Sequence, residues 1–285
     1  MKDFPTDILA CVIDELRDDR RTLLACSLVS KSWLHLARRT FFHTVTLNSE
    51  NRAKRLYQLL TNNPRLAQYV QVLVVSATNH AMQKKKTNDL QAWITTFLPH
   101  FAAKLPHVGS LHFEDVQWNT LAQGLSPSFR ANLSLFRAVK DLEFSGCKFE
   151  TFQDFEAIVW SFASSVNRLT LRSMVWFQPD AAPTSYQLPL QTLRVISGCS
   201  LEMVHVWLTR LQAGRPHGLL RNLEFNEVHD TDFAHLGSIL REIGPNLQSL
   251  KLGVQVKVEQ RKLDQKRQGE PTYPLMPHHI SHDDP

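Results

Sequence analysis

The sequence repeats one short pattern along most of its length, and this repeat constrains the fold more than any other feature. The pattern is a six-residue template, (V/L)-x-x-L-x-(L/F/V), whose alternating apolar residues are typical of a strand with one buried face. A template that returns along a chain in this way indicates stacked units, each of which buries its apolar face against the next. The central leucine of the template is Leu73, Leu111, Leu142, Leu169, Leu193, Leu223 and Leu250 in the seven copies.

Between the copies, the apolar residues change to helical spacing. In the segment 152–163, the side chains of Phe155, Ile158, Val159 and Phe162 fall on one face of a helix. The same spacing occurs in 89–101, 201–211 and 232–244. Each unit is therefore predicted to be a short strand followed by a helix, which makes the fold α/β with a parallel sheet.

These units resemble an irregular leucine-rich-repeat solenoid, which we expect over residues 45–256. The segment 139–147, VKDLEFSGC, follows the leucine-rich-repeat consensus up to its cysteine position. The resemblance implies a parallel sheet on a concave face and helices on the outside. An ordinary doubly wound α/β domain is the alternative, because it also alternates strands and helices, but the 10 glycines include no G-x-G-x-x-G phosphate turn.

The first 44 residues have a different organisation. Pro5, Thr6 and Asp7 predict a helix start with a capping oxygen and early negative charge, and a second helix is expected over 20–28. Ser30 is predicted to cap a third helix that carries Trp33. Three short helices cannot bury all of their apolar side chains by themselves, so a partner is expected.

The segment 27–42, SLVSKSWLHLARRTFF, together with the earlier F-P-T-D-I-L, resembles the F-box of large fungal F-box families. The resemblance implies a three-helix F-box over 1–44 that docks on a Skp-type adaptor and through it joins a cullin-RING ubiquitin ligase. The adaptor-binding residues that it implies are Pro5, Ile8, Leu9, Ile13, Leu16, Leu24, Val29 and Trp33. Alternatively, Trp33 only fixes this helical segment to the first repeat.

Several features that could indicate chemistry are interpreted as structural. No P-loop, G-x-S-x-G or H-E-x-x-H motif is present, so we expect no enzyme, no cofactor and no metal site. Cys147 and Cys199 are predicted to be small buried residues at repeat turns rather than reactive thiols. The polar segment 257–285 is expected to be a flexible tail, and the histidines within its PHHISHDDP ending are interpreted as solvated.

The charge balance and hydropathy argue against two classes of partner. The net charge of +5 is spread in short clusters without interleaved aromatic residues, so no nucleic-acid partner is expected. No apolar run reaches the 18 or so residues of a membrane-spanning helix, so no membrane partner is expected either. We therefore expect a protein of the cytoplasm, the nucleus or both.

Two functions fit these observations equally well. In the first, the chain is the substrate receptor of a Skp–cullin–F-box ubiquitin ligase, and the solenoid binds a protein target. In the second, it is a ligase-independent interaction scaffold. In either case Arg168, Arg172 and Arg194 are candidates to bind an acidic or phosphorylated target, because a guanidinium group suits carboxylate and phosphate.

Overall fold

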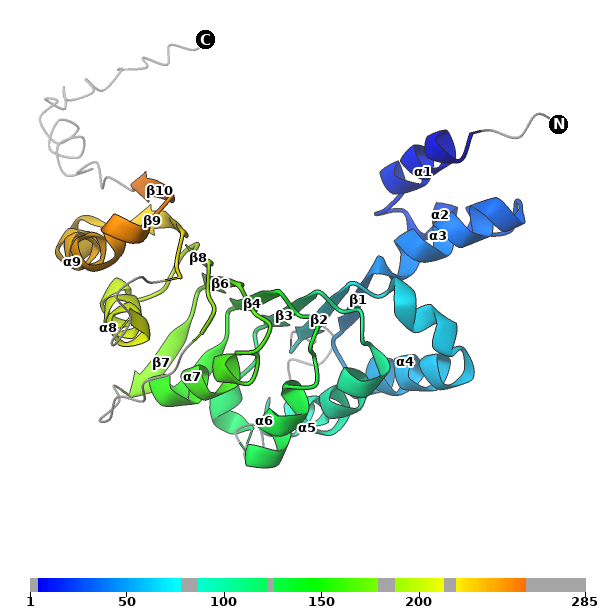
Figure 1. The fold of residues 1–285 in the computed structure, drawn as a ribbon. Helices are drawn as coiled ribbons and strands as arrows, with labels where there is room; N and C mark the ends of the chain where they lie inside the picture. The colour runs from blue at the N-terminus through cyan, green and yellow to red at the C-terminus, as the bar shows by residue number, and fades with distance from the viewer. Residues whose placement is uncertain (1–4, 78–86, 122–125, 179–187, 213–218, 255–285) are drawn as a thin grey trace, which may run out of the picture.

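The computed structural model describes residues 5–77, 87–121, 126–178, 188–212 and 219–254. The N-terminal end begins with three helices, α1 (Thr6–Glu15), α2 (Arg20–Cys26) and α3 (Lys31–His43). Helix α3 leads directly into the first strand, so the helical segment lies at one end of the sheet (Figure 1).

The rest of the described chain is built around a parallel sheet of eight strands, arranged almost in chain order as β1-β2-β3-β4-β6-β8-β9-β10. The strands are β1 (Thr44–Leu47), β2 (Val72–Ser76), β3 (Ser110–Glu114), β4 (Asp141–Ser145), β6 (Arg168–Arg172), β8 (Thr192–Val195), β9 (Asn222–Val228) and β10 (Ser249–Val254). Two further strands, β5 (Lys148–Thr151) and β7 (Val175–Gln178), form a separate parallel pair. The α/β class and the parallel sheet predicted from the repeat are confirmed.

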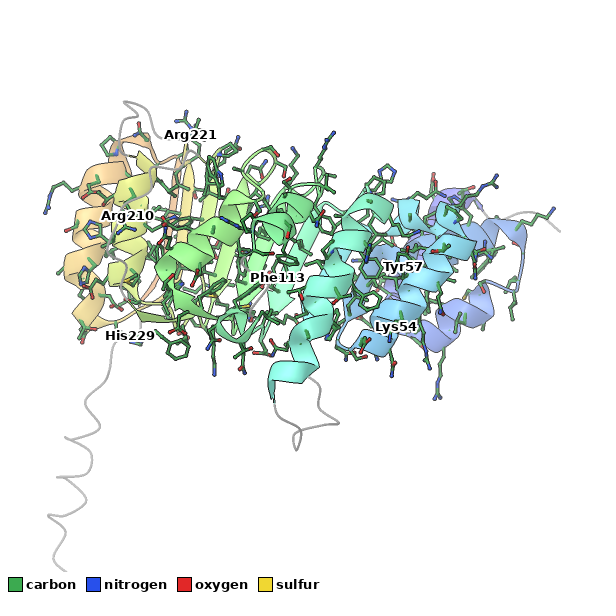
Figure 2. All side chains as sticks on the ribbon, turned by 90° about the horizontal axis from the view of Figure 1, so that it is seen from below. Lys54, Tyr57, Phe113, Arg210, Arg221 and His229 are labelled. Atoms are coloured by element: carbon green, nitrogen blue, oxygen red, sulfur yellow. The ribbon has the colours of Figure 1, made fainter. Side chains whose placement is uncertain are left out.

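Helices connect most of the successive strands and cover one face of the sheet (Figures 1 and 2), whereas the described part of the connection from β6 to β8 contains β7 and no helix. They are α4 (Glu50–Asn62), α5 (Thr87–Lys104), α6 (Pro127–Leu133), α7 (Phe152–Trp160), α8 (Leu201–Gln212) and α9 (Phe233–Ile243), with short 3-10 turns η1 (Pro64–Tyr69), η2 (Trp118–Thr120), η3 (Asp230–Asp232) and η4 (Gly244–Asn246). Within the part of the chain that the structure describes, the other face of the sheet has no covering helix; we call it the open face.

The sheet register places the central leucines of the template directly opposite one another. Leu111 pairs with Leu73 on one side and with Leu142 on the other, and the series continues in the same register to Leu250. From Leu73 to Leu223 these side chains are at most 1% exposed, because they point toward the helices. The predicted inward direction of these leucines is confirmed for the first six copies.

The last copy of the template departs from this prediction. Leu250 and Leu252 occupy the inward positions of β10, yet each is 41% exposed. β10 is the last strand of the sheet in the described ranges, so no following strand and helix cover its apolar residues. Leu250 is therefore a surface residue, and the periodic pattern alone could not reveal this end effect.

Each of four strands leads into a turn with a residue in the left-handed region. These residues are Asp115, Gly146, Ser173 and Gly198, with φ values between 51° and 64°. The backbone N–H of Gly146 donates to the carbonyl oxygen of Arg172 at 2.9 Å, so the turn continues the hydrogen-bond ladder of the sheet. The turns thus stack on one another in step with the strands.

Aromatic rings fill the space behind these turns. Phe113, labelled in Figure 2, stacks on Phe144 with ring centroids 5.3 Å apart, and Trp118 stacks on Phe149 at 5.8 Å. All four side chains are fully buried. The aromatic stack follows the repeat from unit to unit and joins the β5–β7 pair to the main core.

Candidate protein-interaction surfaces

Two of the three N-terminal helices begin at a side-chain cap. Asp19 caps α2 by accepting hydrogen bonds from the backbone N–H groups of Arg21 and Thr22, and Ser30 caps α3 by accepting from the N–H of Trp33 at 3.4 Å. The Ser30 cap agrees with the sequence prediction. Two details differ: α2 ends at Cys26 rather than at residue 28, and α1 has Pro5 at its N-cap with no side-chain cap hydrogen bond.

These helices share a small core of their own. Ile13, Leu23, Cys26 and Ala37 are buried together, and Trp33 packs against them as a half-buried side chain. This contact explains the position of Trp33, because its ring shields from solvent a core that has only four buried residues.

Five large apolar side chains of this segment remain exposed; we call them the N-terminal apolar surface. They are Ile8, Val12, Leu24, Leu28 and Val29. Leu28 is 86% exposed and Val29 is 66% exposed. Single exposed apolar residues are ordinary, but five on about 22 residues of helix and turn indicate an interaction site.

The structure divides the eight residues that were predicted to bind the adaptor into three groups. Pro5, Ile8, Leu24 and Val29 are exposed. Leu9 and Ile13 are buried in the free chain, whereas Leu16 and Trp33 are half-buried against the small core. The buried pair therefore does not belong to the exposed surface of the free chain.

Val12 and Leu28 belong to the N-terminal apolar surface but were not among the eight residues predicted to bind the adaptor. On α1, Ile8 and Val12 are four residues apart on the outer face, while Leu9 and Ile13 have the same spacing on the inner face. The apolar residues of α1 are therefore divided between an exposed face and a buried face of the same helix. Leu28 follows α2 in the turn that leads to Val29, where periodicity gives no signal.

The open face of the sheet carries the second candidate surface. Its central column runs from Val74 through His112, Glu143, Thr170 and Arg194 to the last two strands, as the observed register places them. Asp141 and Arg168 stand side by side in a flanking column. Side chains of opposite charge therefore lie next to one another across the strands.

Two of the three candidate target-binding arginines are already paired. Arg168 lies 3.0 Å from the Asp141 carboxylate, and Arg194 lies 2.9 Å from that of Glu224. Arg172 is exposed and makes no ion pair with any described residue. Acidic neighbours therefore offset the charge of two of the three arginines, and their role in binding a target stays a prediction.

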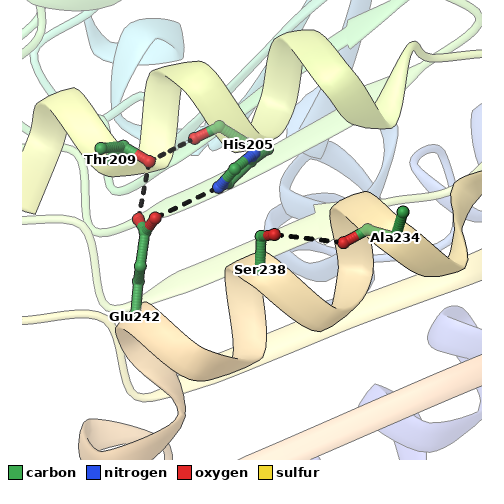
Figure 3. Close-up of polar contacts among 5 residues, drawn as sticks. All are labelled: His205, Thr209, Ala234, Ser238 and Glu242. Atoms are coloured by element: carbon green, nitrogen blue, oxygen red, sulfur yellow. Dashed lines mark hydrogen bonds and ion pairs between the residues drawn. The ribbon is translucent and has the colours of Figure 1, made fainter.

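A polar contact on the helical side joins α8 to α9 (Figure 3). The Thr209 hydroxyl donates to Glu242 Oε2 at 2.6 Å, and His205 Nε2 lies 3.3 Å from Glu242 Oε1. The Thr209 hydrogen bond, followed by the contact with His205, lowers the pKa of Glu242. The contact fastens two adjacent helices and contains no arrangement of a nucleophile and a base aimed at a cavity.

The cysteines at the repeat turns are held as thiols. Burial raises the pKa of Cys147 to about 12 and that of Cys199 to about 11. In the described ranges, no group of three metal-ligating side chains comes together, and no helix is long and apolar enough to cross a membrane. The histidines of the C-terminal tail, and the tail itself beyond residue 254, lie outside the described residues.

Comparison with known proteins bears on the N-terminal end. Residues 1–80 match the family model of the COS11 F-box domain. This match supports an F-box protein. It covers all three N-terminal helices with the N-terminal apolar surface, and extends through β1, α4, η1 and β2. None of the curated proteins matches the sequence.

Proposed function

We propose that this chain is the substrate-recognition subunit of a Skp–cullin–F-box ubiquitin ligase. The N-terminal apolar surface docks the Skp-type adaptor, which connects the chain to a cullin-RING ligase. The observation that carries the proposal is that five large apolar side chains are exposed on α1, on α2 and in the turn after α2, inside the range that matches the F-box model. Exposed apolar surface of this kind is typical of a protein-interaction site.

The remainder of the chain, residues 45–256, acts as a leucine-rich-repeat-like solenoid with its sheet on the concave face, and 257–285 is a polar tail. The repeated register of the central leucines and the stacked left-handed turns support this assignment. In this arrangement the F-box over 1–44 holds the adaptor at one end, and the open face presents a target to the ligase.

The target contacts the open face around Arg172, whose guanidinium group makes no ion pair with a described residue. Arg168 and Arg194 contribute less because each would have to exchange a carboxylate partner for the target. An acidic or phosphorylated group fits the free guanidinium. The chain itself carries out no bond chemistry and works in the cytoplasm, the nucleus or both.

The second candidate is a ligase-independent interaction scaffold, which would use the same helices and the same sheet. The N-terminal apolar surface favours neither, because adaptor binding is common to both. The difference lies in whether the bound target is ubiquitinated and degraded.

Pull-down with purified adaptor tests the proposal. The double variant Leu28→Ser and Val29→Ser should lose adaptor and cullin, because both side chains are strongly exposed anchors. A matched control is Leu135→Ser with Phe233→Ser, which removes two exposed apolar residues outside the F-box. Undiminished adaptor binding by the first variant would refute the docking surface.

Target turnover then separates the ligase from the scaffold. Proteins captured by the full chain should rise in abundance when the proteasome is inhibited, and the Leu28→Ser and Val29→Ser variant should abolish their ubiquitination. Captured proteins whose abundance and ubiquitination respond to neither treatment would favour the scaffold.

A further inference from the structure

A hollow of about 480 Å³ lies where the N-terminal helices meet the first repeat. It is lined by α3, the end of α4 and η1, and we call it the junction pocket. Contact between His35 on α3 and Tyr69 at the end of η1, with ring centroids 5.7 Å apart, holds these two elements together beside it. The pocket is thus bounded by elements that the fold keeps in place.

Two positive charges line the junction pocket. Arg38 comes from α3 and Arg65 from η1, and neither forms an ion pair with a described residue. No carboxylate is among the residues that line the pocket. The second hollow of this region differs, because Asp18 lines it together with Arg17 and Arg20 and offsets their charge.

Neutral donors accompany the two guanidinium groups. Asn62 and Asn63 line the same pocket, and their side-chain amides make no hydrogen bond with a described residue, although the backbone of Asn63 does. Phe42 and Leu66 supply apolar wall on the α3 and η1 sides. The pocket therefore combines uncommitted donors, a charge of +2 and an apolar surface.

We propose that the junction pocket is a binding site for a small anionic molecule that carries phosphate or carboxylate groups on a compact body. Guanidinium groups bind both kinds of oxygen in a bidentate manner, and the asparagine amides can donate to the remaining oxygens. The volume falls within the range of about 300–1,000 Å³ that small-molecule sites occupy. The site is separate from the N-terminal apolar surface and from Arg172, so it adds a ligand to the proposed function.

Isothermal titration of the full chain tests this site, with inorganic pyrophosphate and citrate as separate probes at constant ionic strength. The wild-type chain should bind at least one of them at a single site. Binding of pyrophosphate alone assigns the site to phosphate, and binding of citrate alone assigns it to carboxylate. Absence of binding by both probes at millimolar concentration would overturn the proposal.

Two variants with the same change in net charge make the test specific. Arg38→Gln with Arg65→Gln should weaken binding at least about ten-fold, because two charge-assisted contacts are lost. Arg52→Gln with Arg55→Gln removes two exposed arginines of α4 that do not line the pocket and should leave the affinity unchanged. Equal weakening in both variants would show a general charge effect and overturn the site.

A third variant guards against loss of folding. Asn62→Ala keeps both arginines and removes one exposed neutral donor. It should preserve the far-ultraviolet circular dichroism spectrum and lower the affinity for the probe. Unchanged affinity in Asn62→Ala, combined with an unfolded arginine variant, would count against the pocket. The readout does not involve the adaptor, so failure here is distinct from failure of the proposed function.

Discussion

Arg194 on β8 and Glu224 on β9 form a two-point contact across the open face of the sheet. Arg194 Nε donates to Glu224 Oε2 at 2.9 Å, and Nη2 donates to Oε1 at 3.3 Å. The two residues stand directly opposite each other in the parallel register. The repeat thus brings together two side chains that are 30 residues apart in the sequence.

Replacing Arg194 with Gln should lower the free energy of unfolding only slightly, by about 1 kcal/mol or less. The guanidinium side chain is 41% exposed, so water screens much of the attraction. Chemical denaturation of Arg194→Gln, Glu224→Gln and the double variant would measure the coupling between them. A coupling energy above about 2 kcal/mol would contradict the expected screening.

Replacing Trp33 with Ala should loosen the three N-terminal helices and leave the sheet unchanged. The indole covers the small core of Ile13, Leu23, Cys26 and Ala37, and loss of a half-buried aromatic side chain costs about 2 kcal/mol. Hydrogen exchange should become faster across α1–α3 and stay the same in β3–β9. Leu24→Ala is the control, because Leu24 is 55% exposed and should barely change this exchange.

The strands of the sheet were predictable from the sequence, because the template that marks each strand is only six residues long. Leu142 and Leu169 occupy the same template position, and their observed pairing follows from stacking identical units. The left-handed turns were not predicted, since Asp115 and Ser173 adopt positive φ without being glycine. There the hydrogen bonds to the neighbouring turn decide the conformation.

The candidate surfaces were only partly predictable, because the sequence does not fix which way a side chain points or what it meets. Asp141 and Arg168 stand opposite each other in the register, yet whether the Arg168 side chain turns toward Asp141 or toward a partner depends on its rotamer. On α1, Ile8 is exposed and Leu9 is buried although they are adjacent, so a shift of the helix by one residue would exchange their environments. The junction pocket had no sequence signal, since it joins residues from three elements.

Replacing Gly146 with Ala should destabilise the protein by about 1–2 kcal/mol or more. Gly146 has φ of +64°, where a side chain is strained, and an added Cβ would lie 2.1 Å from Asp115 Oδ1. Gly237→Ala is the matched control: it lies inside α9 with no atom within 4 Å of the added Cβ, and should stabilise the helix by about 0.5–1 kcal/mol. Melting temperatures that move in the same direction would contradict this account.

Replacing Glu242 with Gln should produce a pH-dependent loss of stability. The pKa of Glu242 is lowered below its ordinary value of 4.5, so the carboxylate stabilises the fold above pH 4.5 and this contribution is lost as the pH falls through the lowered pKa. The variant should therefore melt slightly below the wild type at pH 7 and close to it in acid. A difference that stays as large below the lowered pKa of Glu242, where its carboxyl is protonated, would exclude the contacts with Thr209 and His205 as its cause.

The same substitution at two equivalent positions of the repeat should lower the free energy of unfolding by very different amounts. Leu169→Asp should unfold much of the sheet, at a cost above about 4 kcal/mol, because Leu169 is fully buried and an unpaired carboxylate there has no hydrogen-bond donor. Leu250→Asp changes the same template position on β10, where the side chain is 41% exposed, and should cost about 1 kcal/mol or less. Thermal unfolding followed by circular dichroism measures both. Similar melting temperatures for the two variants would mean either that β10 is covered in solution or that the central leucines do not hold the stacked units together.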